Sequence, residues 1–375
     1  MRILFVTPLF FPSLAGAAVY FDTLARAVKR RDPSVRVTIL TRRLAGAPLI
    51  ERREGVLVLR LLPRARPGLG LRARTHAAVT GGLILAISYA LRSDVVHYHT
   101  LVSYRALSAL APLFWAALVG DMRDLAAADE GADPRVYDRC DGLICASENI
   151  VAYMRARGFA ADRLAHVPVP FVPLATPLQT DVEAARAWLG VGDAPYVLYV
   201  GNLTPAKGVA ELLDAMERLW PERPDLHLVL AGAPAAGSDP AFDHRLADML
   251  RRDRRVHAPG TVVRDRVAAL FAGAAVFVLP SRSEGLPRSC LEAFSLGVRV
   301  VLPPGIPEFA RHCADAVLAD VESGAIARAI DAALRAGRRP TYPLQDHAPD
   351  ATAARTIAVW RAARARRHRA TTRRR

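Results

Sequence analysis

The sequence has little lysine and little cysteine, and each scarcity narrows the classes of protein to consider. Among 51 basic residues only Lys29 and Lys207 are lysines, so arginine supplies nearly all of the positive charge. Four cysteines are too few for a disulfide scaffold, and Cys140 and Cys145 lack the second pair or nearby histidines that would complete a zinc site. Such thiols are typical of buried side chains in a reducing cytosol, which predicts a cytoplasmic protein.

The sequence also lacks an apolar run long enough to cross a bilayer. The longest later runs, 77–91 and 106–120, fall short of the ~20 residues that a spanning helix needs. The N-terminal run imitates a secretion signal, but Pro8 and Pro12 interrupt it and it carries a single basic residue. We therefore predict a buried first strand over 2–8, followed by a loop.

Basic residues outnumber acidic residues, and the basic excess is concentrated in one part of the chain. The net charge is +15, and the segment 361–375 contains eight arginines and no acid. Such a segment is typical of a solvated, partly disordered tail or of a contact with an anionic membrane surface. No aromatic residues are interleaved with these arginines, which disfavours single-stranded nucleic acid as a partner.

Apolar runs of strand length alternate with amphipathic helical stretches such as 18–31. In the first half these runs are 2–8, 35–41, 56–62, 94–100 and 141–147. In the second half they are 195–201, 226–232, 275–281 and 298–303. Buried strands that alternate with helices indicate parallel sheets, so we predict two doubly wound α/β domains.

A proline-rich segment separates the two series of strands. Residues 166–177 include four prolines, and proline blocks helix continuation, so this segment is typical of a linker. We expect an N-terminal domain over 1–170, a C-terminal domain over 171–345, and a final helix with a basic tail over 346–375. Ligands of such sheets bind beyond the carboxyl ends of the strands, beside helix N-termini.

The loop GNLTPAKG (201–208) follows a predicted strand and contains one of the two lysines. It does not have the GxxxxGK[ST] order, and the chain has no GxGxxG fingerprint. A loop at a helix start presents amides to an anion, and Lys207 adds a compact charge on a flexible stem. The alternative is a solvated lysine, which the helix dipole would slightly disfavour.

Two glutamates flank a predicted strand-to-helix corner. Pro287 suits the first turn of a helix, so Glu292 lies more than one turn into that helix, close under the loop that carries Glu284. Carboxylates so placed can bind sugar hydroxyls or stabilise a cationic centre. Taken alone, the pair is better explained by helix capping and salt bridges.

Gly16 and two histidines follow strands of the first half. Gly16 stands between a strand and a helix, where a missing Cβ lets a ligand approach the main chain, although an ordinary turn glycine fits as well. His97 and His99 share one face of a strand end, either as structural histidines or as site residues. No third metal ligand is evident beside them in the sequence.

Together these segments resemble the retaining glycosyltransferases of family 4, the group 1 glycosyltransferases, over almost the whole chain. Residues 283–301, SEGLPRSCLEAFSLGVRVV, resemble their E-x7-E segment, and GNLTPAKG resembles their G-R-L-x-x-x-K-G loop. VHAPGTV (256–262), CDGLICASE (140–148) and PGIPE (304–308) are similar to the family as well. The resemblance implies the GT-B fold, in which two Rossmann-like domains face a central cleft and the C-terminal helix, here 350–367, crosses back to the N-terminal domain.

The resemblance implies a nucleoside-diphosphate sugar as the donor and assigns roles in the second half. Lys207 would bind the diphosphate and Glu292 would hold the ribose hydroxyls. Glu284 would contact the donor sugar, and the amides of Gly285 and Leu286 would meet the sugar or phosphate.

The first half would complete the site. By resemblance, Gly16 would approach the diphosphate, and His99, rather than His97, would lie near the donor sugar and the acceptor. His97, Arg123 and Asp124 are candidates for acceptor contact, with a structural histidine and a surface salt bridge as the alternatives.

Three positions depart from the family's pattern. Asn202 stands where the family has a phosphate-binding arginine, and Arg288, at the facing helix start, is the candidate substitute. Ala15 followed by Gly16 replaces a Gly-Gly pair, and PVPF (168–171) replaces an N-G-V-D segment.

The expected activity is therefore sugar transfer with retention of the anomeric configuration. The resemblance implies that no metal ion is needed, and no DxD motif is apparent between the halves; no other cofactor is expected. The acceptor, whether a glycan, a lipid-linked molecule or a small molecule, is not identified.

A catalytically weak GT-B protein that binds a nucleotide-sugar or a partner is one alternative, favoured by Asn202 and Ala15. A nucleotide-sugar epimerase is another, disfavoured by the complete glutamate pair.

Overall fold

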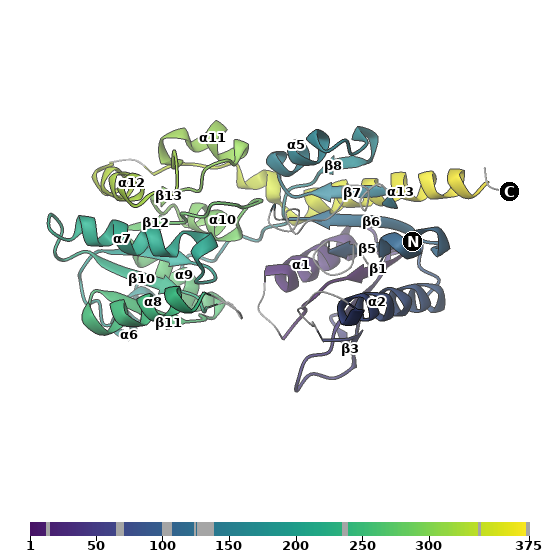
Figure 1. The fold of residues 1–375 in the computed structure, drawn as a ribbon, viewed down its shortest axis with the longest axis horizontal. Helices are drawn as coiled ribbons and strands as arrows, with labels where there is room; N and C mark the ends of the chain where they lie inside the picture. The colour runs from purple at the N-terminus through teal and green to yellow at the C-terminus, as the bar shows by residue number, and fades with distance from the viewer. Residues whose placement is uncertain are drawn as a thin grey trace. The chain divides into compact units, whose positions relative to one another are not determined.

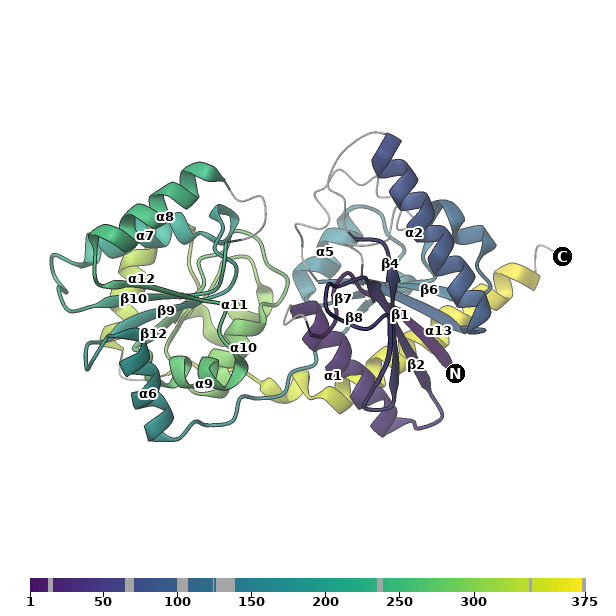
Figure 2. The same ribbon diagram turned by 90° about the horizontal axis from the view of Figure 1, so that it is seen from below.

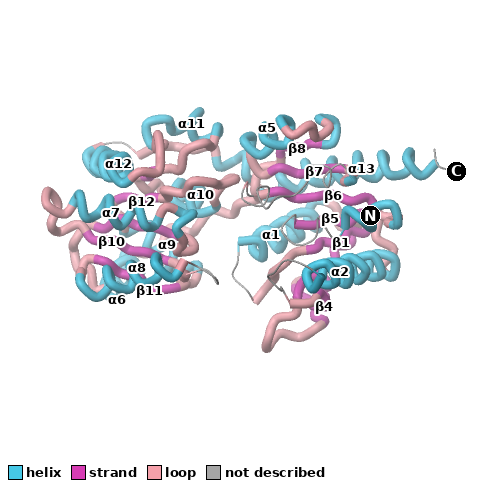
Figure 3. The backbone as a smooth tube through the Cα atoms, viewed as in Figure 1, coloured by secondary structure: helices cyan, strands magenta, loops and turns pink. Residues whose placement is uncertain are grey.

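The chain folds into two compact units, each with its own sheet (Figure 1). In this computed structural model, the first unit comprises residues 1–172 and 345–375, and the second comprises residues 173–344. The described residues are 1–12, 16–64, 71–99, 107–123, 125, 139–234, 239–336 and 339–372. Within each unit the strands form the centre and the helices lie outside them (Figure 3).

The first unit is built on an eight-stranded sheet in the order β3-β4-β2-β1-β5-β6-β7-β8. Every neighbouring pair is parallel except β3 and β4. The strands are β1 (Arg2–Val6), β2 (Arg36–Arg42), β3 (Ile50–Arg53), β4 (Val56–Leu62), β5 (Val95–His99), β6 (Ala117–Met122), β7 (Gly142–Cys145) and β8 (Leu164–His166). Because parallel strands are covered on both faces, β1, β5, β6 and β7 are almost entirely buried.

Helices cover both faces of this sheet. They are α1 (Gly16–Arg31), α2 (Leu71–Ala90), α5 (Glu148–Ala156) and α13 (Pro349–Thr372), with short turns η1 (Ala111–Leu113), η3 (Ala161–Arg163) and η6 (Leu344–His347). Right-handed crossovers place α1 and α2 on opposite faces, because the chain moves in opposite directions along the sheet after β1 and after β4. Figure 2 shows α2 on one side and α1 with α13 on the other.

The C-terminal helix α13 packs on the first unit, against α1, β6 and β7. Trp360 is completely buried, and its ring centroid lies 5.7 Å from that of Phe5 on β1. The prediction that the last helix returns to the N-terminal domain is confirmed.

Over residues 361–372 the chain is helical, which differs from the predicted solvated, partly disordered tail; residues 373–375 lie outside the described residues. Helix α13 continues to Thr372, and four of its arginines pair with acids of the same unit. The closest of these pairs joins Arg367 to Asp141 at 2.8 Å, with both side chains 14% exposed. The arginines thus hold the helix on the sheet, a role that the charge run alone did not reveal.

The second unit contains a five-stranded parallel sheet in the order β11-β10-β9-β12-β13. Its strands are β9 (Tyr196–Val200), β10 (His227–Ala231), β11 (Val256–Gly260), β12 (Val276–Val278) and β13 (Val300–Val301). Its helices are α6 (Gln179–Leu189), α7 (Val209–Leu219), α8 (Pro240–Arg252), α9 (Arg264–Gly273), α10 (Arg288–Ser295), α11 (Pro307–Cys313) and α12 (Ser323–Arg335), with turns η4 (Pro205–Lys207) and η5 (Ala314–Ala316). Strand order changes direction after β11, so the loops after β9 and β12 lie side by side at a switch point.

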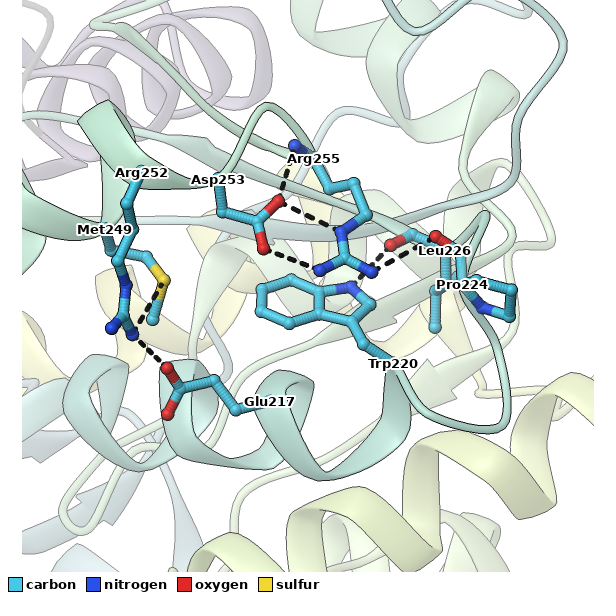
Figure 4. Close-up of polar contacts among 8 residues, drawn as sticks. All are labelled: Glu217, Trp220, Pro224, Leu226, Met249, Arg252, Asp253 and Arg255. Carbon is cyan, nitrogen blue, oxygen red and sulfur yellow. Dashed lines mark hydrogen bonds and ion pairs between the residues drawn. The ribbon is translucent and has the colours of Figure 1, made fainter.

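A polar cluster fastens the outer strand β11 to the end of α7 (Figure 4). Arg255 binds both carboxylate oxygens of Asp253, and its guanidinium lies 4.1 Å from the Trp220 ring centroid. Trp220 donates its indole N–H to the Leu226 carbonyl at 2.7 Å. This cluster holds the amino-terminal side of the sheet and leaves the loops at the carboxyl side for function.

The first run forms the buried strand β1, as predicted. All four cysteines are buried and free, as the prediction of buried thiols required. Among the described residues, no helix combines the length and hydropathy needed to span a bilayer.

Candidate functional site

The loop after β9 is pressed against the segment after β12. Gly208 has φ of +71°, and a Cβ there would lie 1.9 Å from the Pro280 carbonyl oxygen. Position 208 therefore requires glycine for two reasons: its backbone is left-handed, and the Pro280 carbonyl leaves no room for a Cβ. Leu203 also pairs with Pro234 after β10, so the loop is supported from both neighbouring strands.

The contact of these loops brings Lys207 and Glu284 together. The Lys207 Nζ lies 2.7 Å from the Glu284 Oε1, and the two side chains are 25% and 12% exposed. Arg282 ties the same loops: its amide donates to the Ala206 carbonyl at 3.3 Å, and its guanidinium pairs with Glu211 at 2.6 Å. The predicted diphosphate cation and the predicted sugar-binding carboxylate thus form one ion pair.

The turn after Glu284 offers main-chain donors at the start of α10. Gly285 and Leu286 are buried, and within the described part of the chain their amides donate to no protein acceptor. Both residues precede Pro287, the N-cap of α10, so their amides come just before the end of the helix that carries partial positive charge. The turn is therefore suited to hold an anion beside Glu284.

Glu292 lies in α10 between two arginines. Its carboxylate is 3.4 Å from the Arg288 Nε and 3.9 Å from the Arg264 Nη1, and it is 13% exposed. Burial raises the pKa of Glu292, and the two arginines partly oppose that rise. Arg288, the candidate substitute for a charge at position 202, thus lies beside Glu292.

Arg264 was not among the residues predicted from the sequence. It opens α9, directly after the segment 256–262 that resembles the family. Its position at the carboxyl end of β11 is the signal that could have identified it.

Asn202 is exposed at the start of the loop. Its main-chain carbonyl accepts the Tyr199 hydroxyl at 2.7 Å, which holds the turn after β9. Burial, followed by the negative charge of Glu284, raises the pKa of Tyr199. Asn202 carries no charge, so Lys207 is the cation that this loop supplies.

In the first unit, Gly16 is the first residue of α1. It is exposed, and a Cβ at this position would meet no described protein atom within 4 Å. Packing of the described residues therefore does not explain the glycine, and its exposed main chain leaves room for a ligand to approach. Ala15, the residue before it, lies outside the described residues.

His97 is completely buried and has both ring nitrogens occupied. Trp360 donates its indole N–H to Nδ1 at 3.2 Å, so Nε2 carries the proton and donates to Asp121 at 3.0 Å. The ring also packs edge-on against Phe5 at 5.0 Å. His97 is therefore engaged as a structural histidine, and we do not retain a direct acceptor contact for it.

Asp121 connects His97 to Arg123. Its Oδ2 accepts from both side chains, at 3.0 Å and 3.1 Å, and Arg123 lies over the Tyr20 ring. Burial by itself raises the pKa of Asp121, but Arg123 and the His97 hydrogen bond outweigh it and the net shift is downward. The sequence predictions included Arg123 but missed Asp121, the last residue but one of β6.

His99 lies two residues after His97 on β5, opposite Asp121 on β6. It is 5% exposed. Burial, helped by the positive charge of Arg123, lowers the pKa of His99 to about 4, so its ring is neutral at pH 7. Asp124, the other acceptor candidate, lies outside the described residues.

Each unit therefore gathers candidate residues at the carboxyl ends of its strands. The second unit supplies a cation, two carboxylates and two loop amides that donate to no acceptor among the described residues, a set suited to a phosphorylated sugar compound. The first unit supplies a neutral histidine, a positioned arginine and an open helix start.

Comparisons with known proteins agree with this arrangement. Residues 182–344 match the family model "Glycosyl transferases group 1". The chain is 31% identical to D-inositol 3-phosphate glycosyltransferase of Kineococcus radiotolerans, over 76% of this chain and 72% of that one. It is 25% identical to alpha-galactosylglucosyldiacylglycerol synthase of Streptococcus pneumoniae, over 60% of this chain and 64% of that one.

Solved structures share the fold. The structure of Anabaena HepE in complex with UDP and glucose has a TM-score of 0.69 at 19% identity, covering 96% of this chain and 94% of that one. Starch synthase IV of Arabidopsis thaliana, bound to ADP and acarbose, has a TM-score of 0.71 at 11% identity, covering 97% and 99%. The predicted GT-B fold is confirmed.

Proposed function

Because the chain belongs to the group 1 glycosyltransferases, we propose that it transfers a sugar from a nucleoside-diphosphate sugar to a hydroxyl acceptor, with retention and without a metal ion. Membership of the family makes it a glycosyltransferase; the donor class, stereochemistry and metal independence are the proposal. The observation that carries it is the 2.7 Å contact between Lys207 and Glu284, held by loops that Gly208 allows to touch.

The donor's diphosphate is assigned to Lys207 and the amides of Gly285 and Leu286. Departure of a nucleoside diphosphate concentrates negative charge on the leaving phosphate, and a fixed cation with oriented amides stabilises that charge. Lys207 is already positioned by its ion pair, so little reorganisation is needed when the anion binds. Two of its three ammonium protons remain available for phosphate oxygens while one serves Glu284.

Glu284 is assigned to the donor sugar. Sugar hydroxyls donate to carboxylates, and a nearby negative charge also stabilises an oxocarbenium-like centre. The acceptor oxygen bonds to the anomeric carbon as the carbon–oxygen bond to the diphosphate breaks. Attack on the same face retains the configuration, and the acceptor proton passes to the leaving phosphate oxygen. The products are a glycoside and a nucleoside diphosphate.

The remaining assignments concern binding. Glu292, flanked by Arg288 and Arg264, is assigned to the ribose hydroxyls. Gly16 is assigned to close approach of the diphosphate at the start of α1. His99, neutral because burial lowers its pKa, is assigned to hydrogen bonds with the donor sugar or acceptor.

The names of the relatives support a nucleotide donor, but they point to more than one class of acceptor. HepE is described in complex with UDP and glucose, and starch synthase IV bound to ADP. Relatives named for inositol phosphate and for a glycosylated diacylglycerol point to acceptors of different polarity. Under this proposal the reaction takes place in a reducing cytosol, which the four buried, free thiols support.

A donor screen tests the proposal. Thermal shift across uridine, guanosine and adenosine diphosphate sugars identifies the base, because a ligand that binds the folded state raises the melting temperature. Incubation of the best donor with candidate acceptors in EDTA should yield a glycoside whose anomeric signal matches the donor's. A product with inverted anomeric configuration would overturn the claim of retention. Loss of activity in EDTA that added metal restores would overturn the claim of metal independence. Binding without turnover would indicate a catalytically weak protein, and an epimer formed without acceptor would indicate an epimerase.

A further inference from the structure

The outer face of α2 is apolar although it faces solvent. Exposed residues without charge recur along one side of it: Ala78, Val79, Gly82, Ala86 and Tyr89. Val79 is 51% exposed and Tyr89 is 55% exposed. The covered face is no more apolar, since it includes the buried hydroxyls of Thr80 and Ser88. A surface helix normally has a charged or polar outer face, so this face is unusual for one exposed to water.

The apolar surface continues beyond the helix. The Tyr89 hydroxyl donates to the Leu113 carbonyl at 2.7 Å, which joins the end of α2 to η1. Leu113 is 56% exposed, and Trp115, two residues later, is 59% exposed. We call Val79, Gly82, Ala86, Tyr89, Leu113 and Trp115 the α2 patch. Contiguous exposed apolar surface of this kind marks a site of interaction.

The chain around the α2 patch is strongly basic. Residues 55–120 contain seven arginines, of which Arg60 is buried against Glu51 while Arg64, Arg74 and Arg92 are exposed, and one acid, Asp94. That acid is already paired, with Arg364 at 3.1 Å and with the Arg2 amide at 2.8 Å. Exposed Arg74 lies in the first turn of α2, and exposed Arg92 follows its last residue. Trp115 also packs edge-on against His368 on α13, at 6.0 Å between ring centroids.

The charge and the exposed apolar side chains of the α2 patch distinguish between possible binding partners. A second copy of this chain would bring the same arginines against each other, and like charges oppose such a contact. An anionic bilayer offers the complementary charge, and its interface accommodates Trp and Tyr rings beside apolar side chains.

We propose that the α2 patch docks on the surface of an anionic lipid bilayer, inserting Val79 and Trp115 while flanking arginines meet the lipid headgroups. The contact would bring the transferase of the proposed function to a membrane, where a lipid-linked acceptor would be found. The proposal assigns the membrane contact to the α2 patch and not to residues 361–375, where it was predicted. In that segment Arg361, Arg364 and Arg367 form ion pairs with acids of the first unit. Helix α13 contributes its position beside Trp115.

Flotation of the full chain with lipid vesicles tests the proposal. Wild type should float with vesicles of phosphatidylglycerol and phosphatidylcholine and much less with phosphatidylcholine alone. The Val79→Glu/Trp115→Glu variant should lose about tenfold or more in vesicle affinity, because two carboxylates replace inserted side chains. Leu178→Glu/Trp188→Glu is the matched control, since it replaces one exposed aliphatic residue and one exposed Trp in the second unit. It should bind as wild type.

Three readouts keep the outcomes distinct. Circular dichroism checks folding, and the milder Val79→Ser/Trp115→Ser variant replaces the acidic one if that variant unfolds. Titration with UDP, GDP and ADP monitors the donor site, so loss of vesicle binding with nucleotide binding intact supports the α2 patch alone. Equal vesicle binding by wild type and the patch variant would overturn the proposal. So would a wild-type dimer that the patch variant converts to monomer while neither form binds vesicles.

Discussion

At the scale of single residues, the scarcity of lysine has a structural counterpart. Lys207 reaches a carboxylate from a neighbouring loop, whereas Lys29 lies on the surface near the Glu54 carbonyl. An ammonium is a compact charge with three donors, so it can hold Glu284 and phosphate oxygens together. Arginine's planar fork would occupy more of the space between the two loops.

Glu284→Gln separates binding from chemistry at this pair. The amide keeps the side chain's shape but removes the negative charge, which leaves the Lys207 charge entirely for phosphate. We expect nucleoside diphosphate to bind at least as tightly as in wild type, while sugar transfer falls by about 100-fold or more, as for other electrostatic stabilisers. Calorimetry and a product assay measure the two effects. Transfer at the wild-type rate would remove Glu284 from the site.

His99 predicts a pH dependence of stability. Its folded pKa is about 4, below the ordinary value for histidine in an unfolded chain, ~6.5. Between these values the unfolded chain binds more protons, so the free energy of unfolding falls as pH drops through this window, by on the order of 3 kcal/mol. Urea titrations at pH 7, 5.5 and 4.5 measure the slope. The slope should be shallower in His99→Gln; an unchanged slope would place its origin in other buried histidines.

At the scale of elements, the contact between the loops after β9 and β12 predicts a paired test. Gly208 and Gly190 have nearly the same φ, +71° and +72°, but only Gly208 would place a Cβ against Pro280. Gly190→Ala should therefore lose about 1 kcal/mol, the cost of the left-handed conformation alone. Gly208→Ala should lose more and should also weaken nucleotide binding, because the loop carrying Lys207 must move.

Chemical denaturation and calorimetry on both variants check this prediction. The Gly190→Ala variant shows how much of the loss comes from backbone conformation alone. If the two alanine variants lose equal stability and bind nucleotide equally, the loop contact does not position Lys207.

The sequence predicted most buried strands because their apolar runs are continuous. It placed β1, β4, β9 and β10 within one or two residues of their observed ends. The strand β3 was missed because IERR has no apolar pattern, and it pairs antiparallel at the sheet edge where burial is slight. The strand β6 was missed because its apolar residues merge with the run that precedes it.

The site was less predictable than the strands. The resemblance to the family indicated Lys207, Glu284 and Glu292, whereas their positions after strands alone left a solvated lysine and capping or salt-bridging glutamates as alternatives. The partners of His97 were not predictable, since Asp121 and Trp360 lie 24 and 263 residues away in sequence and meet it only through strand order and the return of α13. Tertiary packing, rather than the local sequence, makes His97 a structural histidine while His99 stays a candidate site residue.

At the scale of the whole molecule, the two units carry different parts of the proposed function. The second contains the cation and the paired carboxylates assigned to the donor, and the first contains His99, Gly16 and the α2 patch. The excess of arginine serves two purposes in the first unit. Some arginines fasten α13 to the sheet, and others lie around an apolar face. Net charge alone did not distinguish these uses, because it does not record which arginines are paired.

The most direct test of the central claim is calorimetric titration of wild type, Lys207→Ala and Lys29→Ala with UDP, GDP and ADP. At least one nucleotide should bind wild type, and Lys29→Ala should bind it equally. Lys207→Ala should lose roughly 1.5–3 kcal/mol of binding free energy, the range for a hydrogen bond to a charged group. Equal affinity of all three proteins, or no binding of any nucleotide to wild type, would contradict the assignment of a diphosphate to Lys207.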